Sequence, residues 1–120
     1  MKGFVDGELR ALIEVLVSAT PHAEKQPLKV WVDTAFNGGL VIPREQIAIL
    51  GLAPASSTEA TLADGQLVEL ETFSCYLEWF GKEFRTQVIA NDGHFPLLGT
   101  VLLSNRKLII DYNLGTLELE

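Results

Sequence analysis

Apolar and polar residues alternate in short stretches along most of this chain, and a period of two is typical of half-buried β-strands. The pattern is plainest over 28–32, where Leu28, Val30 and Val32 alternate with Lys29 and Trp31. β-Branched and aromatic residues there also favour a strand. Further strands are predicted at 3–5, 9–17, 40–42, 59–62, 67–71, 72–79, 82–89, 108–112 and 116–120.

The segment 4–17 permits two interpretations. As a strand, 9–17 places only apolar residues on one face and a mixture on the other. We therefore predict two strands, 3–5 and 9–17, joined by a turn at Asp6-Gly7. One amphipathic helix over 4–17 is the alternative.

Turn residues divide the remaining strands into hairpins. Asp64-Gly65 and Phe80-Gly81 each stand between two predicted strands and indicate a hairpin. Pro43 suits the first position of a helix over 44–50, which Gly51 would end. A second short helix is predicted at 102–105. Loops are predicted at 18–26 and 91–94, and a connector at 52–57. The sequence thus predicts a mostly β protein: a small closed or nearly closed barrel with one or two short helices.

A length of 120 residues predicts a single domain, 1–120. No apolar run approaches the roughly 20 residues of a membrane span. Cys75 is the only cysteine, so no internal disulfide can form. Asp6, Glu8 and Arg10 soon follow Met1, a pattern unlike a signal peptide. We therefore expect a cytoplasmic protein without a membrane partner.

The formal charge is −7, and the lysines and arginines are scattered. Nucleic-acid binding rests on clustered cations, so it is not expected. His22 and His94 lie far apart, and each has one nearby carboxylate, Glu24 and Asp92 respectively. Neither pair matches a metal-ligand motif. We expect no metal and no cofactor.

One β-rich run leads an aspartate directly into a turn of small residues: 30–39 is Val-Trp-Val-Asp-Thr-Ala-Phe-Asn-Gly-Gly. An ionised carboxylate is costly at the end of an apolar strand, so its presence suggests a site. The stretch resembles the active-site turn of retropepsin-like aspartic peptidases, Asp-Thr/Ser-Gly after apolar strand residues. It is most similar to the small bacterial and archaeal single-domain members, where Asp-Thr-Gly-Phe-Asn-Gly is typical.

Two further segments extend the resemblance. Residues 95–103, Phe-Pro-Leu-Leu-Gly-Thr-Val-Leu-Leu, resemble the Leu/Ile-Leu/Ile-Gly segment that ends a strand and opens a short helix in that family. Residues 63–66, Ala-Asp-Gly-Gln, resemble the tip of its flap hairpin. The resemblance implies the retropepsin-like fold, in which Gly99 packs behind the catalytic turn.

Aspartic peptidases hydrolyse peptide bonds with a water held between two carboxyl groups that share one proton. This chain has one copy of the motif, with Asp33 as its carboxylate. A dyad therefore requires a homodimer, in which the two copies of Asp33 face each other. The resemblance implies that the Thr34 hydroxyl forms hydrogen bonds across the dimer axis to the turn of the partner chain. The alternative is a turn threonine whose hydroxyl bonds to its own backbone.

The remaining site residues are assigned around this dyad. Ala35 completes the catalytic turn in place of the typical glycine. Phe36, Asn37, Asp64, Gly65 and Gly99 are the candidates for contact with a peptide or protein substrate, although Asp64 equally suits a solvated turn. A non-catalytic dimerisation or peptide-binding module of the same fold is the second hypothesis. An unrelated small β-barrel is the third.

Overall fold

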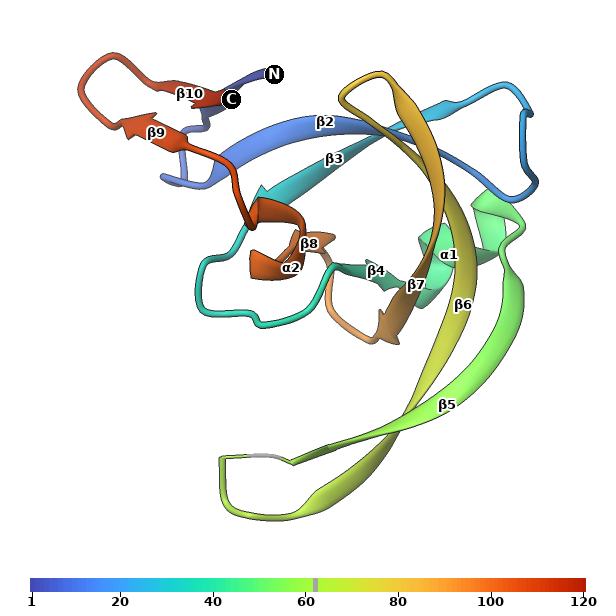
Figure 1. Ribbon diagram of the computed structural model, residues 1–120. Helices are drawn as coiled ribbons and strands as arrows, with labels where there is room; N and C mark the ends of the chain where they lie inside the picture. Colours follow the sequence, from blue (N-terminus) through green and yellow to red (C-terminus); the bar gives the residue numbers. More distant parts are fainter. Residues whose placement is uncertain (62) are drawn as a thin grey trace.

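The computed structural model describes residues 1–61 and 63–120, and this part of the chain forms a sheet of ten strands with two short helices (Figure 1). The strands are β1 Lys2–Val5, β2 Ala11–Ser18, β3 Gln26–Val32, β4 Leu40–Pro43, β5 Ala53–Thr61, β6 Leu67–Trp79, β7 Lys82–Asn91, β8 Leu97–Leu98, β9 Leu108–Asp111 and β10 Thr116–Leu119. The helices are α1 Arg44–Leu50 and α2 Thr100–Leu103. The predicted mostly β architecture is confirmed.

Six strands pair in a closed ring. The order around it is β2–β3–β8–β4–β7–β6, and β6 pairs back onto β2. The β3–β8 and β4–β7 pairs are parallel, whereas the other pairs are antiparallel. Buried side chains from all six strands fill the ring and form the core.

The first segment is a strand, so the alternative of a single helix is wrong. In β2 the residues Ala11, Ile13, Val15 and Val17 are buried, whereas Glu14 is exposed. The apolar face predicted from the alternation is therefore the core face. Burial of this apolar face favours the strand in a segment whose composition also suits a helix.

The strand begins at Ala11, not at Leu9. Asp6 accepts hydrogen bonds from the backbone N–H groups of Glu8 at 3.0 Å and Arg10 at 2.9 Å. These bonds close a turn longer than Asp6-Gly7, in which Leu9 has a φ of 64°. The hydrogen-bonding capacity of one aspartate thus extends the turn by two residues.

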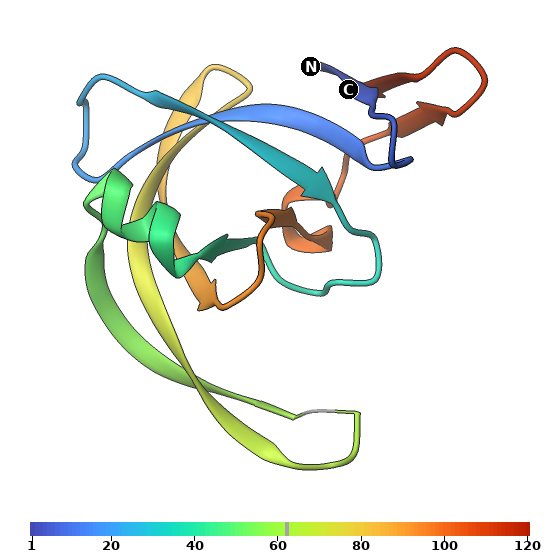
Figure 2. The same cartoon turned by 180° about the vertical axis from the view of Figure 1, so that it is seen from behind.

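The predicted connector at 52–57 is also wrong, because a strand begins at Ala53. β5 and the outer half of the long strand β6 form an arm, which projects from the ring and bends toward the side of residues 33–39 (Figures 1 and 2). Residues 67–71 and 72–79, predicted as two strands, are one continuous strand. Leu62, predicted to end the first strand of this hairpin, lies outside the described residues.

A bulge marks the joint between the arm and the ring. The register of β5 against β6 shifts between Pro54 and Ser57, and such bulges bend a strand. Thr72, which is only 4% exposed, faces this bulge from β6. Its hydroxyl donates to the Ser56 carbonyl and accepts from the Ser56 N–H at 3.2 Å. The side chain thereby replaces the ladder bonds that the bulge removes.

The helices are short. Pro43 ends β4 and precedes α1 as its N-cap, one position earlier than predicted. Gly51 ends α1 with a φ of 70°, as expected for a helix-stopping glycine. Neither helix in the described part of the chain is long and apolar enough to cross a membrane.

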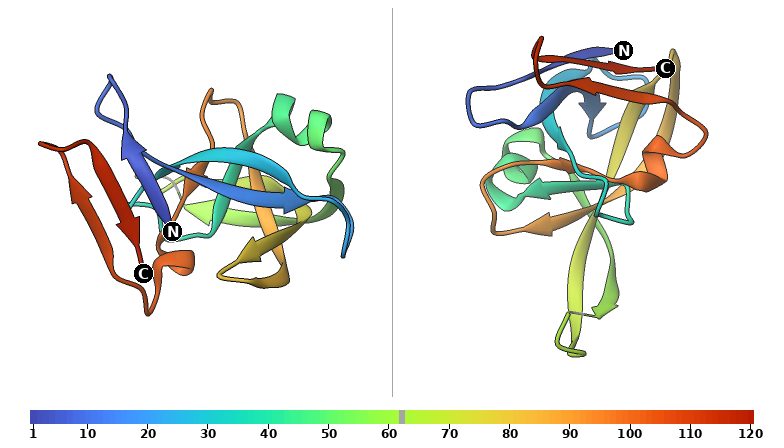
Figure 3. Two further views of the ribbon diagram at one scale, coloured as in Figure 1. Left: turned by 90° about the horizontal axis from the view of Figure 1, so that it is seen from above. Right: turned by 90° about the vertical axis from the view of Figure 1, so that its left-hand side faces the viewer.

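Both chain ends lie together outside the ring. β1 pairs with β2 on one side and with β10 on the other, and β10 pairs with β9 (Figure 3). The N-terminal ammonium donates to the Leu119 carbonyl at 2.7 Å. A three-stranded extension, β1–β10–β9, is therefore built entirely within one chain.

Cys75 provides a test of core packing. Its side chain is fully buried in β6, and burial raises the pKa of its thiol to about 11. The nucleophilic thiolate is therefore scarce at neutral pH. We expect no labelling by a thiol reagent at pH 8 in the native protein and complete labelling in guanidinium chloride. Rapid labelling of the native protein would show that the ring opens.

Candidate active site

Asp33 stands directly after β3, in the turn that leads to β4. Its backbone N–H donates to the Leu98 carbonyl at 2.9 Å, which extends the β3–β8 pairing by one residue. Its carboxylate accepts the Ala35 N–H at 3.0 Å, and its carbonyl accepts the Phe36 N–H at 3.2 Å. The half-buried aspartate is therefore oriented from both sides by the backbone.

A second segment, residues 99–101, holds this turn in place through backbone hydrogen bonds. The backbone N–H of Gly99 donates to Gly39 at 2.8 Å, that of Thr100 to Phe36 at 2.8 Å, and that of Val101 to Gly38 at 3.1 Å. The Thr100 hydroxyl also donates to the Phe36 carbonyl at 3.3 Å. These bonds join the strand β8 and the first turn of α2 to residues 36–39.

The same bonds explain why α2 spans 100–103 and not the predicted 102–105. The first N–H groups of a helix have no partner within the helix. Here Thr100 and Val101 donate theirs to the neighbouring turn, so the helix begins immediately after Gly99.

Only glycine fits at position 99. A Cβ there would lie 2.3 Å from the Gly38 carbonyl oxygen and 2.6 Å from that of Phe36. It would also lie 2.5 Å from the Phe36 ring. The expected close packing of Gly99 against the turn is thus present in the geometry.

Phe36 folds back over this contact. A Cβ built on Gly38 would meet the Phe36 ring at 2.4 Å, and the ring also lies against Gly99. The half-buried ring therefore supports the turn, while Asn37 is exposed beside it.

Thr34 and Ala35 form the exposed tip of the turn. Among the described residues, the Thr34 hydroxyl has no hydrogen-bond partner. A single chain thus presents one carboxylate and one free hydroxyl at its surface. The shared-proton chemistry expected for an aspartic peptidase needs a second carboxyl group close to the first.

Asp64 and Gly65 lie at the tip of the arm. The Asp64 carboxylate accepts the Gln66 N–H at 3.0 Å, and Gly65 has a φ of 87°. Both residues therefore stabilise the turn itself, and the arm holds this turn on the same side as residues 33–39 (Figures 1 and 3).

An aromatic cluster at the end of β3 was not predicted. Trp31 lies two residues before Asp33 and hence on the same face of the strand, with 38% of its surface exposed. Its ring meets that of Phe95 edge-on at 6.4 Å. The Arg10 guanidinium lies 4.5 Å from the centre of the Phe95 ring and is held by Asp6 at 2.8 Å. The alternation of residues before Asp33 places Trp31 on the same face as Asp33, so the sequence could have indicated Trp31 as a neighbour of the site. Its contact with Phe95 could not be predicted, because that contact depends on the pairing of β3 with β8.

The two histidines have different neighbours in the structure. His22 lies 3.7 Å from Glu83, and Asp92 pairs with Arg44 at 3.0 Å instead of with His94. The described residues contain no group of three metal-ligating side chains.

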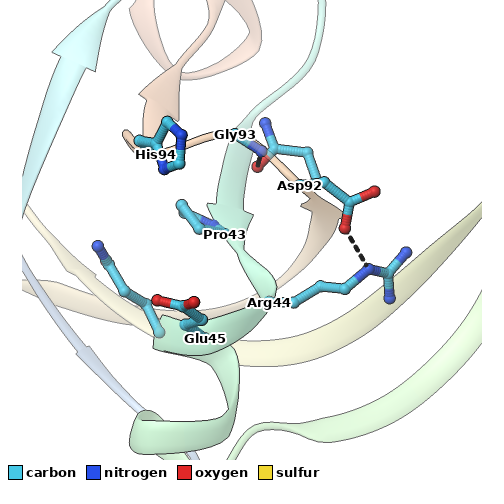
Figure 4. A pocket seen from close by; sticks show the side chains of 8 residues that line it. Pro43, Arg44, Glu45, Asp92, Gly93 and His94 are labelled. Atoms are coloured by element: carbon cyan, nitrogen blue, oxygen red, sulfur yellow. Dashed lines mark hydrogen bonds and ion pairs between the residues drawn. The ribbon is translucent and has the colours of Figure 1, made fainter.

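A cavity of about 180 Å³ lies between the start of α1 and the β7–β8 loop (Figure 4). Arg44, Glu45, Asp92 and His94 line it, together with Pro43, Gln46, Asn91 and Gly93. Asp33 is not among the residues that line it, so this cavity is not the candidate active site.

The arrangement of these elements is the fold of the retropepsin-like aspartic proteases. Among solved structures, the chain is similar to a retropepsin-like aspartic protease from Rickettsia conorii, with 18% identity and a TM-score of 0.65 over 99% of this chain and 88% of that one. It is also similar to the EIAV protease complexed with the inhibitor HBY-793, with 20% identity and a TM-score of 0.60 over 83% of this chain and 90% of that one. No protein-family model and no curated protein matches the sequence. The resemblance seen in the sequence is therefore confirmed for the fold.

The Gly99 contact predicts a stability effect. Gly99→Ala forces a methyl group against two carbonyl oxygens and should cost about 1–3 kcal/mol. Gly7→Ala is the matched control, because a Cβ there meets nothing within 4 Å. Urea unfolding of both variants measures the difference. Equal midpoints would contradict the tight packing behind the turn.

Proposed function

We propose that this protein is an aspartic endopeptidase that works as a homodimer and hydrolyses peptide bonds with a water activated by two copies of Asp33. The observation that carries the proposal is the Asp33 turn, held from behind by Gly99 in a fold that it shares with solved proteases. The arm, whose tip lies on the same side as the turn, suits a lid over a bound peptide.

The chemistry follows from two carboxyl groups that share one proton. The ionised carboxylate takes a proton from the water, whose oxygen attacks the carbonyl carbon of the substrate. The protonated carboxyl group donates to the carbonyl oxygen. Collapse of the tetrahedral intermediate breaks the C–N bond, and the departing nitrogen takes up a proton. No cofactor takes part in this scheme.

The neighbouring residues have distinct roles in this proposal. Thr34, exposed at the tip of the turn, bonds across the dimer axis to the partner's turn. Ala35 fixes the Asp33 carboxylate through its N–H. Asn37, Asp64 and Gly65 contact the substrate, whereas Phe36 and Gly99 support the turn. We propose the cytoplasm as the compartment, with which a single buried cysteine is compatible.

A non-catalytic dimerisation or peptide-binding module is the second candidate. Ala35 favours it, because a Cβ stands where this type of turn usually has glycine. In such a module the two copies of Asp33 need not approach each other.

The first test is the substitution Asp33→Asn. The amide cannot accept a proton from water, so cleavage of a denatured protein substrate at acid pH should fall about 100- to 10,000-fold, the usual contribution of general acid–base catalysis. Asp92→Asn is the matched control, since its carboxylate is 89% exposed and lies outside the turn. Circular dichroism establishes that both variants fold. Undiminished cleavage by purified Asp33→Asn would refute the proposed mechanism.

The second test is dilution. If each active site needs two chains, the rate per chain falls as the protein is diluted through its dimer dissociation constant. Sedimentation and peptide cleavage, measured over the same concentrations, should change together. A rate per chain that is constant while sedimentation shows a monomer would eliminate the shared dyad.

A further inference from the structure

The arm leaves the support of the ring at Thr72. Residues 72–79 of β6 pair with β7, and the pair of Thr72 with Ile89 is the end of that ladder. Beyond it, residues 67–71 pair only with β5 within residues 1–61 and 63–120. Two-stranded ribbons twist more than wider sheets and are marginally stable by themselves. The arm can therefore bend most easily where the third strand ends.

The bulge in β5 lies at the same level. The register of β5 against β6 shifts between Pro54 and Ser57, which interrupts the ladder. The Thr72 hydroxyl bonds both backbone groups of Ser56 instead, because it accepts from the N–H and donates to the carbonyl. One buried side chain thus connects the two strands of the arm across the interruption.

Packing around this joint is open on two sides. A cavity of about 160 Å³ lies beside Ser56 and Thr72. A second cavity, of about 360 Å³, lies between α1 and the joint, against Pro54 and Phe73. Close-packed interiors resist displacement, because each side chain is held by its neighbours. At this joint part of that contact is missing, so the angle of the arm depends on specific bonds.

Arg44 provides a second restraint on the joint. Its guanidinium lies 3.1 Å from the carboxylate of Glu71, the residue next to Thr72 on the arm. It also lies 3.0 Å from the carboxylate of Asp92 (Figure 4). The start of α1 is thereby tied to the arm and to the β7–β8 loop. All three charged side chains are exposed, and exposed ion pairs contribute little. The buried Thr72 hydroxyl is therefore the main restraint.

We propose that the arm pivots at this bulge and that Thr72 is a positioning residue, whose hydroxyl sets the angle at which the arm extends toward the side of the Asp33 turn. The effect on substrate binding rests on the proposed function, in which the arm covers a bound peptide, whereas the pivot itself does not. A lid that is held less firmly weakens the binding of substrate and transition state by the same factor, so KM rises and kcat stays unchanged.

Two nitroxide labels measure the position of the arm without a cleavage assay. They are attached in the full chain at Glu14→Cys in β2 and Glu69→Cys in the arm, both of which are exposed positions. Cys75 is buried and does not react. Dilution with an excess of unlabelled protein leaves only the distances within one chain. Pulsed electron paramagnetic resonance then gives the distribution of distances between the arm and the ring.

Three variants are compared in this labelled background. Valine has the shape of threonine without its hydroxyl, so Thr72→Val should broaden the distribution. Thr72→Ser keeps the hydroxyl and should keep the distribution narrow. Thr116→Val is the matched control, because it removes a hydroxyl from an exposed position in β10, outside the arm. Circular dichroism establishes that the variants fold.

The kinetics of peptide cleavage by the same variants, without labels, separate the position of the arm from folding. Thr72→Val should raise KM about 3- to 10-fold, the factor that corresponds to the net contribution of one hydrogen bond, and kcat should stay unchanged. Thr72→Ser and Thr116→Val should leave both constants unchanged. A loss of folded protein would lower kcat and leave KM as it is.

The outcomes separate the pivot from the activity. A broader distribution in Thr72→Val but not in Thr72→Ser supports the pivot, and the absence of cleavage by the parent protein would then refute only the proposed function. Equal distributions in all variants overturn the pivot, whatever the kinetics. A broader distribution with an unchanged KM overturns the positioning role.

A second variant covers the case in which Thr72→Val does not fold. Arg44→Gln removes both ion pairs from an exposed side chain, so this variant should fold. It should also broaden the distribution, because the arm is then released from α1. An unchanged distribution in Arg44→Gln would in that case overturn the pivot.

Discussion

The backbone hydrogen bonds between residues 97–101 and the turn 33–39 are the constraint on which the candidate site depends. They connect the turn to β8 and α2, so the position of Asp33 is set by the ring and not by a free loop. Each bond contributes only about 1 kcal/mol net. Their closeness excludes any side chain at Gly99. A single residue without a Cβ therefore allows two distant segments to hold one carboxylate in place.

Each chain supplies one carboxyl group, that of Asp33, at the candidate site. Asp33 is half-buried and neighbours exposed Thr34 and Ala35, so water reaches it in the monomer. Two such groups brought together cannot both ionise easily, because like charges at close range raise one pKa and lower the other. The proton sharing that the proposed reaction needs would thus be created by assembly. In the proposed reaction, activity would therefore depend on the association of two chains.

The sequence could predict features that depend on local pattern. The alternation in 11–17, the stop at Gly51 and the hairpin at Phe80-Gly81 all depend on neighbouring residues, and all are present. It could not predict where β5 begins, because the pairing of Ala53 with Ser74 is a long-range contact in a stretch of weak strand formers.

The candidate site likewise has some features that the sequence could predict and others that it could not. Asp33, Thr34 and Gly99 were found from short motifs, and the structure brings Asp33 and Gly99 to the same turn. The cluster of Arg10, Trp31 and Phe95 was missed, since it joins three segments that only the folded sheet brings together. Trp31 belongs to the strand that leads into Asp33, and Phe95 precedes the segment that holds the turn. Short motifs thus identify residues that lie close in the sequence, whereas a cluster drawn from three segments becomes visible only once β3 has paired with β8.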